Sequence, residues 1–212
     1  MDEIDPRRFL ISMKGMGIES YFSQRKDVLT LSFLRKKVKE CTKCPLCTTR
    51  RNVVFGEGND RAQLVFIGEA PGEEEDIQAR PFVGRAGKFL DQMIERAGLK
   101  REDVFICNVL KCRPPNNRDP EPMEVEACKG YLLSQLEIIK PKIICTLGRH
   151  AYNALFSVDE KITRIRGVLT SYNGIRLLPT YHPAFLLRNQ NRINEVWEDM
   201  DRLKQLLRGR VS

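Results

Sequence analysis

The sequence predicts an α/β fold, a three-layer α/β/α sandwich with a central, mostly parallel four-stranded sheet. Three observations lead to this prediction: four short apolar segments, amphipathic segments between them, and polar segments rich in Gly or Pro after most of the apolar ones. Strands covered on both faces are apolar throughout, and strands that alternate with helices form parallel sheets. A chain of 212 residues, 42% hydrophobic and 30% charged, is long enough for one such domain.

The helices are predicted from apolar residues at helical spacing and from residues that begin helices. In the segment 24–40, Leu31, Leu34 and Val38 recur among basic residues. Pro122 suits the first turn of a helix, where its missing N–H is not needed. The expected helices span residues 24–40, 84–97 and 122–139, a segment that begins at 148, and residues 189–207.

The strands are predicted from short apolar runs bounded by turn residues. The run QLVFIG ends at Gly68, and the run IRLLPT is followed by a polar loop. The four expected strands span residues 63–68, 103–109, 142–147 and 175–180. Ligands bind at the carboxyl ends of the strands in such sheets. We therefore expect the site in the segments that follow three of the strands, at 68–76, 111–120 and 181–189.

The chain is expected to consist of an N-terminal extension, residues 1–32, and one domain, residues 33–212. No apolar run approaches the roughly 20 residues that a membrane span needs. The first residues, MDEIDPRRFL, contain no apolar signal region. We therefore expect a cytoplasmic, nucleoid-associated protein with no membrane partner.

The positive charge is concentrated near the C-terminus. The net charge is +8, and residues 140–212 contain 13 basic and 6 acidic residues. A basic segment of this kind favours a polyanion as partner, with nucleic acid as the first candidate. A solvated basic face is the alternative interpretation.

Seven cysteines need an explanation in an intracellular protein, because disulfides are rare there. Cys41 and Cys44 have the short spacing of a metal knuckle, but Cys44 and Cys47 have the same spacing, so the pair is ambiguous. Cys107 and Cys145 lie within apolar strands and are expected to be core residues. Four thiolates suit zinc or an iron–sulfur cluster, and unrelated reduced thiols are the alternative.

Five segments together resemble the family 4 (iron–sulfur) uracil-DNA glycosylases. They are GEAPGEEED (68–76), RPFVGRAGKFLD (80–91), CNVLKCRPPNNRDP (107–120), LGRHA (147–151) and YHPAFLLRN (181–189). The resemblance covers roughly residues 33–208. It implies a 4Fe–4S cluster held by Cys41, Cys44, Cys112 and Cys128, with Cys47 unused. It also implies a hydrolase that removes uracil from DNA in base excision repair.

The resemblance implies which residues bind uracil: Gly68, Glu69, Ala70, Glu75, Phe82, Asn108 and His182. Phe82 is expected to stack on the flipped base, and Asn108 to read its imide edge, because an amide donates and accepts at once. His182 is expected to donate a hydrogen bond to O2, where negative charge develops. Glu75 is expected to block the methyl group of thymine.

The expected catalytic residues are Glu69, His182 and Asn117. In a related branch of the superfamily an aspartate activates the water, but Ala70 stands at that position here and has no acid–base function. Glu69, Glu75, Asp76 and Asn117 remain the candidates for orienting water or stabilising the sugar. Ligation of Cys112, four residues after Asn108, is expected to fix the loop that contains Asn108 and Asn117.

The expected partner is uracil-containing DNA, single- or double-stranded, bound by a monomer. Arg149, Arg166 and Arg188 are expected to bind phosphates, and Leu186 is expected to lie in the loop that enters the duplex. Three alternatives stay open: a relative that binds uracil-DNA by covalent trapping, a glycosylase of broader specificity, and a zinc-binding nucleic-acid module. The loop at 159–167 has no histidine, which counts against covalent trapping.

Overall fold

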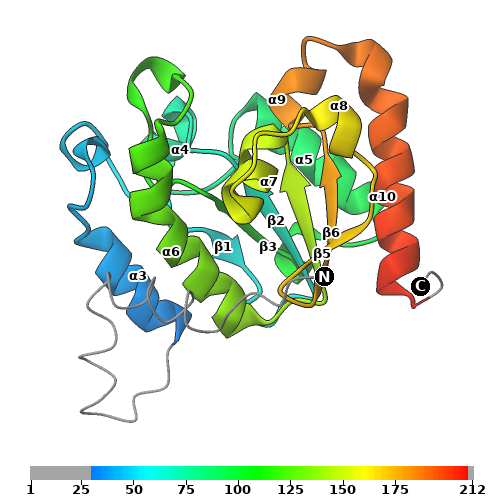
Figure 1. The fold of residues 1–212 in the computed structure, drawn as a ribbon, viewed down its shortest axis with the longest axis horizontal. Coiled ribbons are helices and arrows are strands. Elements are labelled where there is room, and N and C mark those ends of the chain that lie inside the picture. The colour runs from blue at the N-terminus through cyan, green and yellow to red at the C-terminus, as the bar shows by residue number, and fades with distance from the viewer. Residues whose placement is uncertain (1–29, 210–212) are drawn as a thin grey trace.

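A six-stranded sheet forms the centre of the protein, as a computed structural model of residues 30–209 shows (Figure 1). The order of the strands is β1-β3-β2-β4-β6-β5. The four inner strands run parallel, and the two edge strands pair antiparallel with their neighbours. The strands are β1 (Glu57–Gly58), β2 (Leu64–Gly68), β3 (Phe105–Asn108), β4 (Ile143–Leu147), β5 (Thr170–Tyr172) and β6 (Ile175–Thr180).

Helices cover both faces of the sheet. The α-helices are α3 (Leu31–Lys39), α4 (Glu73–Gln78), α5 (Arg85–Arg96), α6 (Pro122–Ile139), α7 (Arg149–Phe156), α8 (Ile162–Ile165), α9 (Pro183–Leu186) and α10 (Ile193–Leu207). Four short 3-10 helices complete the described part: η1 (Pro45–Thr48), η2 (Arg101–Asp103), η3 (Pro115–Asn117) and η4 (Gln190–Arg192). Within residues 30–209, no helix is long and apolar enough to cross a membrane.

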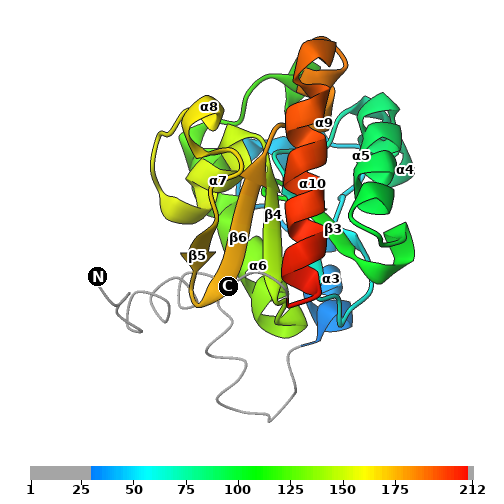
Figure 2. The ribbon, with the colours of Figure 1, turned by 90° about the vertical axis from the view of Figure 1, so that its right-hand side faces the viewer.

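The alternation of side chains along β2 divides the core into two layers. Val65 and Ile67 face a cluster built with α3, α6 and α7. Leu64 and Phe66 face a second cluster built with α5 and α10. Figure 1 shows α3 and α6 on one side of the sheet and α10 on the other, and in Figure 2 α10 lies in front of the sheet. The predicted three-layer sandwich is therefore confirmed.

Helix α6 begins and ends at residues that suit those positions. Pro122 is its first residue, and the carboxylate of Glu124 accepts a hydrogen bond of 2.9 Å from the backbone N–H of Glu121. The helix ends at Lys140, which has a left-handed conformation and precedes Pro141. The predicted bounds of 122–139 agree with these ends.

The other predicted elements are also present, with small shifts of their ends. The four predicted strands form the parallel part, but the sheet has six strands rather than four, because β1 and β5 pair at its edges. The acidic segment after β2 contains α4, a helix that the sequence analysis does not predict. Helix α3 confirms the predicted helix at 24–40 from residue 31 onward, and residues 24–29 lie outside the described part. The boundary between residues 32 and 33 stays a prediction.

The carboxyl ends of the inner strands meet at one edge of the sheet. Gly68, the last residue of β2, is the register partner of Asn108, the last residue of β3. Leu147 of β4 is likewise the partner of Thr180 of β6. The segments that follow these four residues therefore converge, as expected for a parallel sheet.

Candidate active site

Gly68 lies at the centre of the converging segments. A Cβ atom at this position would overlap Oδ1 of Asn108 and would lie 2.5 Å from Cζ of Phe82. The amide of Asn108 and the ring of Phe82 therefore both lie against the backbone of Gly68. Only glycine leaves room for this arrangement.

Asn108 presents an unpaired acceptor at this point. The side chain is 2% exposed, and within residues 30–209 its Oδ1 has no hydrogen-bond partner. A buried acceptor without a partner costs about 1–3 kcal/mol. Such an atom at a strand end is typical of a group that a ligand satisfies.

The Phe82 ring is held in place by its own loop. Phe82 has a φ of 52°, which is strained for an aromatic residue. Oε1 of Glu75 accepts hydrogen bonds from the N–H groups of Val83 (2.9 Å) and Gly84 (3.0 Å). Oε2 of Glu75 accepts from Gly72 N–H at 3.1 Å. The Glu75 carboxylate thus ties the loop of Phe82 to the start of α4.

His182 lies beside Phe82 and has a defined donor. The two ring centroids are 5.7 Å apart. Nδ1 of His182 accepts a hydrogen bond from Ala184 N–H at 3.1 Å, so a proton on the neutral ring lies on Nε2. Burial lowers the pKa of His182 to about 4, although Glu75 opposes this shift. Near neutral pH this histidine is therefore an uncharged donor.

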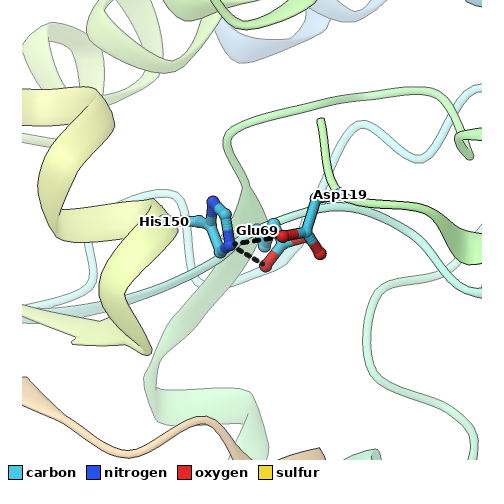
Figure 3. A group of neighbouring side chains, drawn as sticks. All are labelled: Glu69, Asp119 and His150. Carbon is cyan, nitrogen blue, oxygen red and sulfur yellow. Dashed lines mark ion pairs between the residues drawn. The ribbon is translucent and has the colours of Figure 1, made fainter. Parts of the chain in front are cut away.

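Glu69, Asp119 and His150 form a second group next to Gly68 (Figure 3). Nε2 of His150 lies 3.7 Å from Oε2 of Glu69 and 3.4 Å from Oδ2 of Asp119. Burial, and then the charge of Asp119, raises the pKa of Glu69 to about 7, and Arg149 partly offsets this. Burial and Arg149 lower the pKa of His150. The Glu69 carboxyl group can therefore exchange a proton near neutral pH.

The sequence predicted only Glu69 of this group. Asp119 and His150 lie in two of the quoted segments, 107–120 and 147–151, but neither was predicted as a site residue, because their contact forms only when the strand ends converge. The three ligand atoms lie within 4.8 Å of one another, a spacing that a metal ion also requires. However, Nη2 of Arg149 lies 3.4 Å from Oδ2 of Asp119, and a cation would have to compete with it. A groove of about 420 Å³ lies beside Glu69 and His150.

Asn117 and Asp76, two other candidates for orienting water, accept hydrogen bonds from the protein itself. Oδ1 of Asn117 accepts a hydrogen bond of 2.8 Å from Nε of Arg113, and the residue is exposed. Asp76 is 2% exposed, and its carboxylate accepts from the N–H groups of Arg51 and Asn52. Ala70 packs against the core cluster on the α6 side. The catalytic role of Asn117 stays a prediction, and Asp76 has a structural role.

The residues expected to bind DNA divide into two kinds. Arg149, which contacts Asp119, and Arg188 are both exposed. Arg166, in contrast, donates to Asp199 at 2.7 Å and to Glu195 at 3.1 Å, so its guanidinium is already engaged by carboxylates. We therefore withdraw Arg166 as a phosphate ligand, since carboxylates rather than solvent surround its charge.

Leu186 requires a correction. It is 1% exposed and belongs to the core cluster of α5 and α10, so it cannot enter a duplex while the loop is folded in this way. Phe185 is the exposed apolar residue of this loop, with 40% of its surface accessible. Its ring stacks on Tyr181, with centroids 5.0 Å apart. The short helix α9 explains the difference, because successive side chains of a helix point about 100° apart around its axis, so Leu186 faces the core while Phe185 does not.

Five cysteines line one cavity between α3, η1 and α6. Its lining comprises Val38, Cys41, Lys43, Cys44, Cys47, Arg50, Lys111, Cys112, Ala127, Cys128 and Tyr131. Nη1 of Arg50 donates to Sγ of Cys112 at 3.2 Å, and Lys111 N–H donates to Sγ of Cys128 at 3.3 Å. The remaining two, Cys107 and Cys145, are fully buried in strands, which confirms their prediction as core residues.

This cavity fits a metal centre with sulfur ligands. Burial raises the pKa of Cys128 to about 12 and also raises that of Cys112, so both thiols keep their protons unless a cation replaces them. Basic side chains and N–H donors around the sulfurs would offset the negative charge of thiolates. Cys47 lines the same cavity, so the geometry leaves five candidates for four positions.

Comparison with known proteins supports the family that the five sequence segments resemble. The model of the uracil DNA glycosylase superfamily matches residues 55–201. The type-4 uracil-DNA glycosylase of Thermotoga maritima is 49% identical over 186 residues, which cover 84% of this chain and 95% of the relative. That of Saccharolobus solfataricus is 50% identical, with 84% and 86% covered. That of Archaeoglobus fulgidus is 43% identical, with 84% and 93% covered. The chain therefore belongs to the type-4 uracil-DNA glycosylases.

Proposed function

We propose that the protein binds DNA that contains uracil, flips the uracil nucleotide out of the helix and hydrolyses its N-glycosidic bond. The product is an abasic site, the substrate of later steps of base excision repair. The type-4 relatives support this function. The observation that supports it best is Oδ1 of Asn108, which has no hydrogen-bond partner among residues 30–209 and lies beside the Phe82 ring over Gly68.

Asn108 distinguishes uracil from cytosine. The N3–H of uracil donates to Oδ1, and its O4 accepts from the amide NH₂. Cytosine presents an unprotonated N3 and an amino group at the same edge, so both contacts would be mismatched. Phe82 stacks on the base and contributes about 1–3 kcal/mol. This offsets the few kcal/mol that flipping costs.

His182 stabilises the leaving group. As the bond between C1′ and N1 breaks, its electron pair moves into the uracil ring, and negative charge gathers on O2. The Nε2–H of His182 donates to this oxygen, while the hydrogen bond from Ala184 to Nδ1 keeps the ring neutral. A donor of this kind contributes about 2.7–4 kcal/mol to catalysis.

Glu69 holds the water that completes the reaction. The water oxygen forms the new bond to C1′, and its proton passes to the Glu69 carboxylate, which His150 and Asp119 flank. A carboxylate with a pKa near 7 is suited to this task at neutral pH. The sugar already has cationic character at this stage, so positioning the water matters more than activating it.

Cys41, Cys44, Cys112 and Cys128 hold a 4Fe–4S cluster. Their donor set fits, since thiolates are the usual ligands of such clusters. The cluster, when bound, acts as a covalent cross-link between the N-terminal segment, the loop after β3 and α6. Arg50 and Lys111 donate hydrogen bonds to the ligand sulfurs and hold them in place.

DNA lies across the carboxyl edge of the sheet, with a monomer as the working unit. Arg149 and Arg188 bind phosphates. Phe185 replaces Leu186 as the side chain that enters the space vacated by the flipped base. Glu75 excludes thymine by occupying the space near its methyl group, a role that rests on the family resemblance.

One assay distinguishes a glycosylase from a protein that only binds or traps uracil in DNA. The protein is incubated with a labelled oligonucleotide that contains one uracil, and abasic sites are then cleaved with alkali. A glycosylase yields one break at the uracil, whereas a protein that only binds or traps uracil yields none. Matched oligonucleotides with thymine, cytosine or hypoxanthine test broader specificity. Iron, sulfide and zinc analysis of the same preparation separates the cluster from a zinc site.

A further inference from the structure

Lys111 is a buried charged residue between the cysteine cavity and the end of β3. Its side chain is 1% exposed, although lysine is almost never fully buried without a partner. Burying an ammonium group is costly unless hydrogen bonds satisfy it. The position of this group therefore needs a reason beyond packing.

The ammonium group of Lys111 binds the backbone of Asn108. Nζ donates a hydrogen bond of 2.7 Å to the carbonyl oxygen of Asn108 and another of 2.6 Å to Oε1 of Gln135. Nε2 of Gln135 in turn donates to the carbonyl oxygen of Phe55 at 2.8 Å. Gln135 is fully buried on α6, so the acceptor that orients Nζ is itself fixed.

The backbone of Lys111 binds the cysteine cavity. Its N–H donates to Sγ of Cys128 at 3.3 Å, its carbonyl oxygen accepts from Val54 N–H at 2.8 Å, and its neighbour is Cys112. One residue thus contacts a sulfur through its backbone and Asn108 through its side chain.

Three hydrogen bonds hold the turn that begins at Asn108. Val109 N–H donates to the carbonyl of Gly68 at 2.9 Å, and Leu110 N–H donates to that of Glu69 at 3.0 Å. The bond from Nζ completes the set, because it engages the carbonyl of Asn108 itself. Without it, the peptide after Asn108 would keep the bond from Val109 N–H but lose the one to its carbonyl oxygen. A change in the tilt of this peptide would move the Oδ1 that lies over Gly68.

We propose that Lys111 is a positioning residue, which orients the amide of Asn108 toward uracil. Through Lys111, this orientation also depends on an assembled cysteine site. The proposal rests on the proposed function of Asn108. Lys111 does not touch the base. It acts through the Asn108 carbonyl, and the sulfur of Cys128 fixes the backbone from which it extends.

The test compares Lys111→Met, which keeps the length and removes the donor, with Lys142→Met, which removes the same charge at an exposed position. Each protein is measured for iron and sulfide content, for single-turnover excision of uracil and for inhibition by free uracil. We expect Lys111→Met to weaken uracil inhibition and slow excision by about 10- to 100-fold, the loss of one hydrogen bond to a charged group. Affinity for uracil-free DNA and iron content per folded protein should match those of the unmodified protein.

Several results would overturn the proposal. One is an unchanged excision rate and unchanged uracil inhibition in Lys111→Met. Another is a loss of activity that only parallels the loss of iron, since a purely structural role predicts that. If Lys111→Met does not fold, Gln135→Met removes the second acceptor of Nζ and should weaken uracil inhibition in the same direction, and no change would contradict the proposal. Absence of excision by the unmodified protein would instead refute the proposed function.

Discussion

Gly68 and Asn108 are register partners at the ends of two parallel strands, and the Asn108 amide lies over the bare Cα of Gly68. This pairing places a recognition group where only glycine leaves space for it. The fold therefore determines which residue recognises the base, because the register of β2 and β3 decides which side chain reaches the pocket.

Gly68→Ala should therefore remove uracil excision. The added methyl group would overlap Oδ1 of Asn108 and press on the Phe82 ring. We expect a fall of more than about 100-fold in the single-turnover rate, because a 1 Å misplacement of a binding group costs this much. Thermal unfolding should show a loss of about 1–3 kcal/mol. Gly174→Ala is the control, because its added methyl group would meet open space but a φ of 78° strains the backbone, so it should lose stability and keep its excision rate.

The rate of excision should rise with pH through about 7. The pKa of Glu69 is raised to about 7, and its charged form is the one that accepts a proton from water. Below pH 7 the rate should fall about tenfold per pH unit as Glu69 becomes protonated. His182, with its pKa lowered to about 4, stays neutral over this range, so its titration causes no second change of the rate with pH.

Single-turnover rates of the unmodified protein and of Glu69→Gln between pH 5 and pH 9 test this assignment. The variant should be slower, and its rate should not depend on pH around 7. A variant that keeps the original profile would show that another group accepts the proton.

Cys112→Ala should lower stability and activity together. The cysteine is four residues after Asn108 and shares its cavity with Lys111, so loss of this ligand should loosen the recognition loop. Visible absorbance, iron content, thermal unfolding and excision should all decrease. Cys47→Ala is the matched control, since the family pattern assigns no ligand role to it. Unchanged stability and excision in Cys112→Ala would contradict a role for the cluster in this loop.

Phe185→Ala and Leu186→Ala should have different effects. Removal of the exposed Phe185 ring should slow excision from double-stranded DNA more than from single-stranded DNA, with little change in stability. Leu186 is buried, so its truncation should cost about 2–5 kcal/mol in unfolding free energy. Urea denaturation and paired excision assays measure both. A stable Leu186→Ala protein with a specific defect on duplex DNA would show that Leu186, rather than Phe185, enters the duplex.

Much of the fold follows from patterns that are local in the sequence. The apolar runs that became β2 and β4 and the Pro122 start of α6 are such patterns. The two edge strands were not predictable in this way. β1 has only two residues, and both edge strands form because a neighbour offers unpaired backbone groups.

The residues of the site also divide into those that motifs predicted and those that only the fold brings together. The family resemblance pointed to Phe82, Asn108 and His182. Phe82 and Asn108 meet over Gly68, and the ring of His182 lies beside that of Phe82. Asp119 and Lys111 lie in the quoted segment 107–120, but no role was predicted for them. Their contacts with His150 and Gln135 join segments that are distant in the sequence. Leu186 was misjudged because a single turn of α9 decides which of two adjacent apolar residues faces the core.

The most direct test of the whole account is the excision of uracil by the unmodified protein and by Asn108→Ala. Both are incubated under single-turnover conditions with an oligonucleotide that contains one uracil, and alkali then reveals abasic sites. The account predicts a break at the uracil with the unmodified protein and a rate at least about 100-fold lower with Asn108→Ala, at similar iron content and stability. No break with the unmodified protein, or an equal rate with the variant, would contradict it.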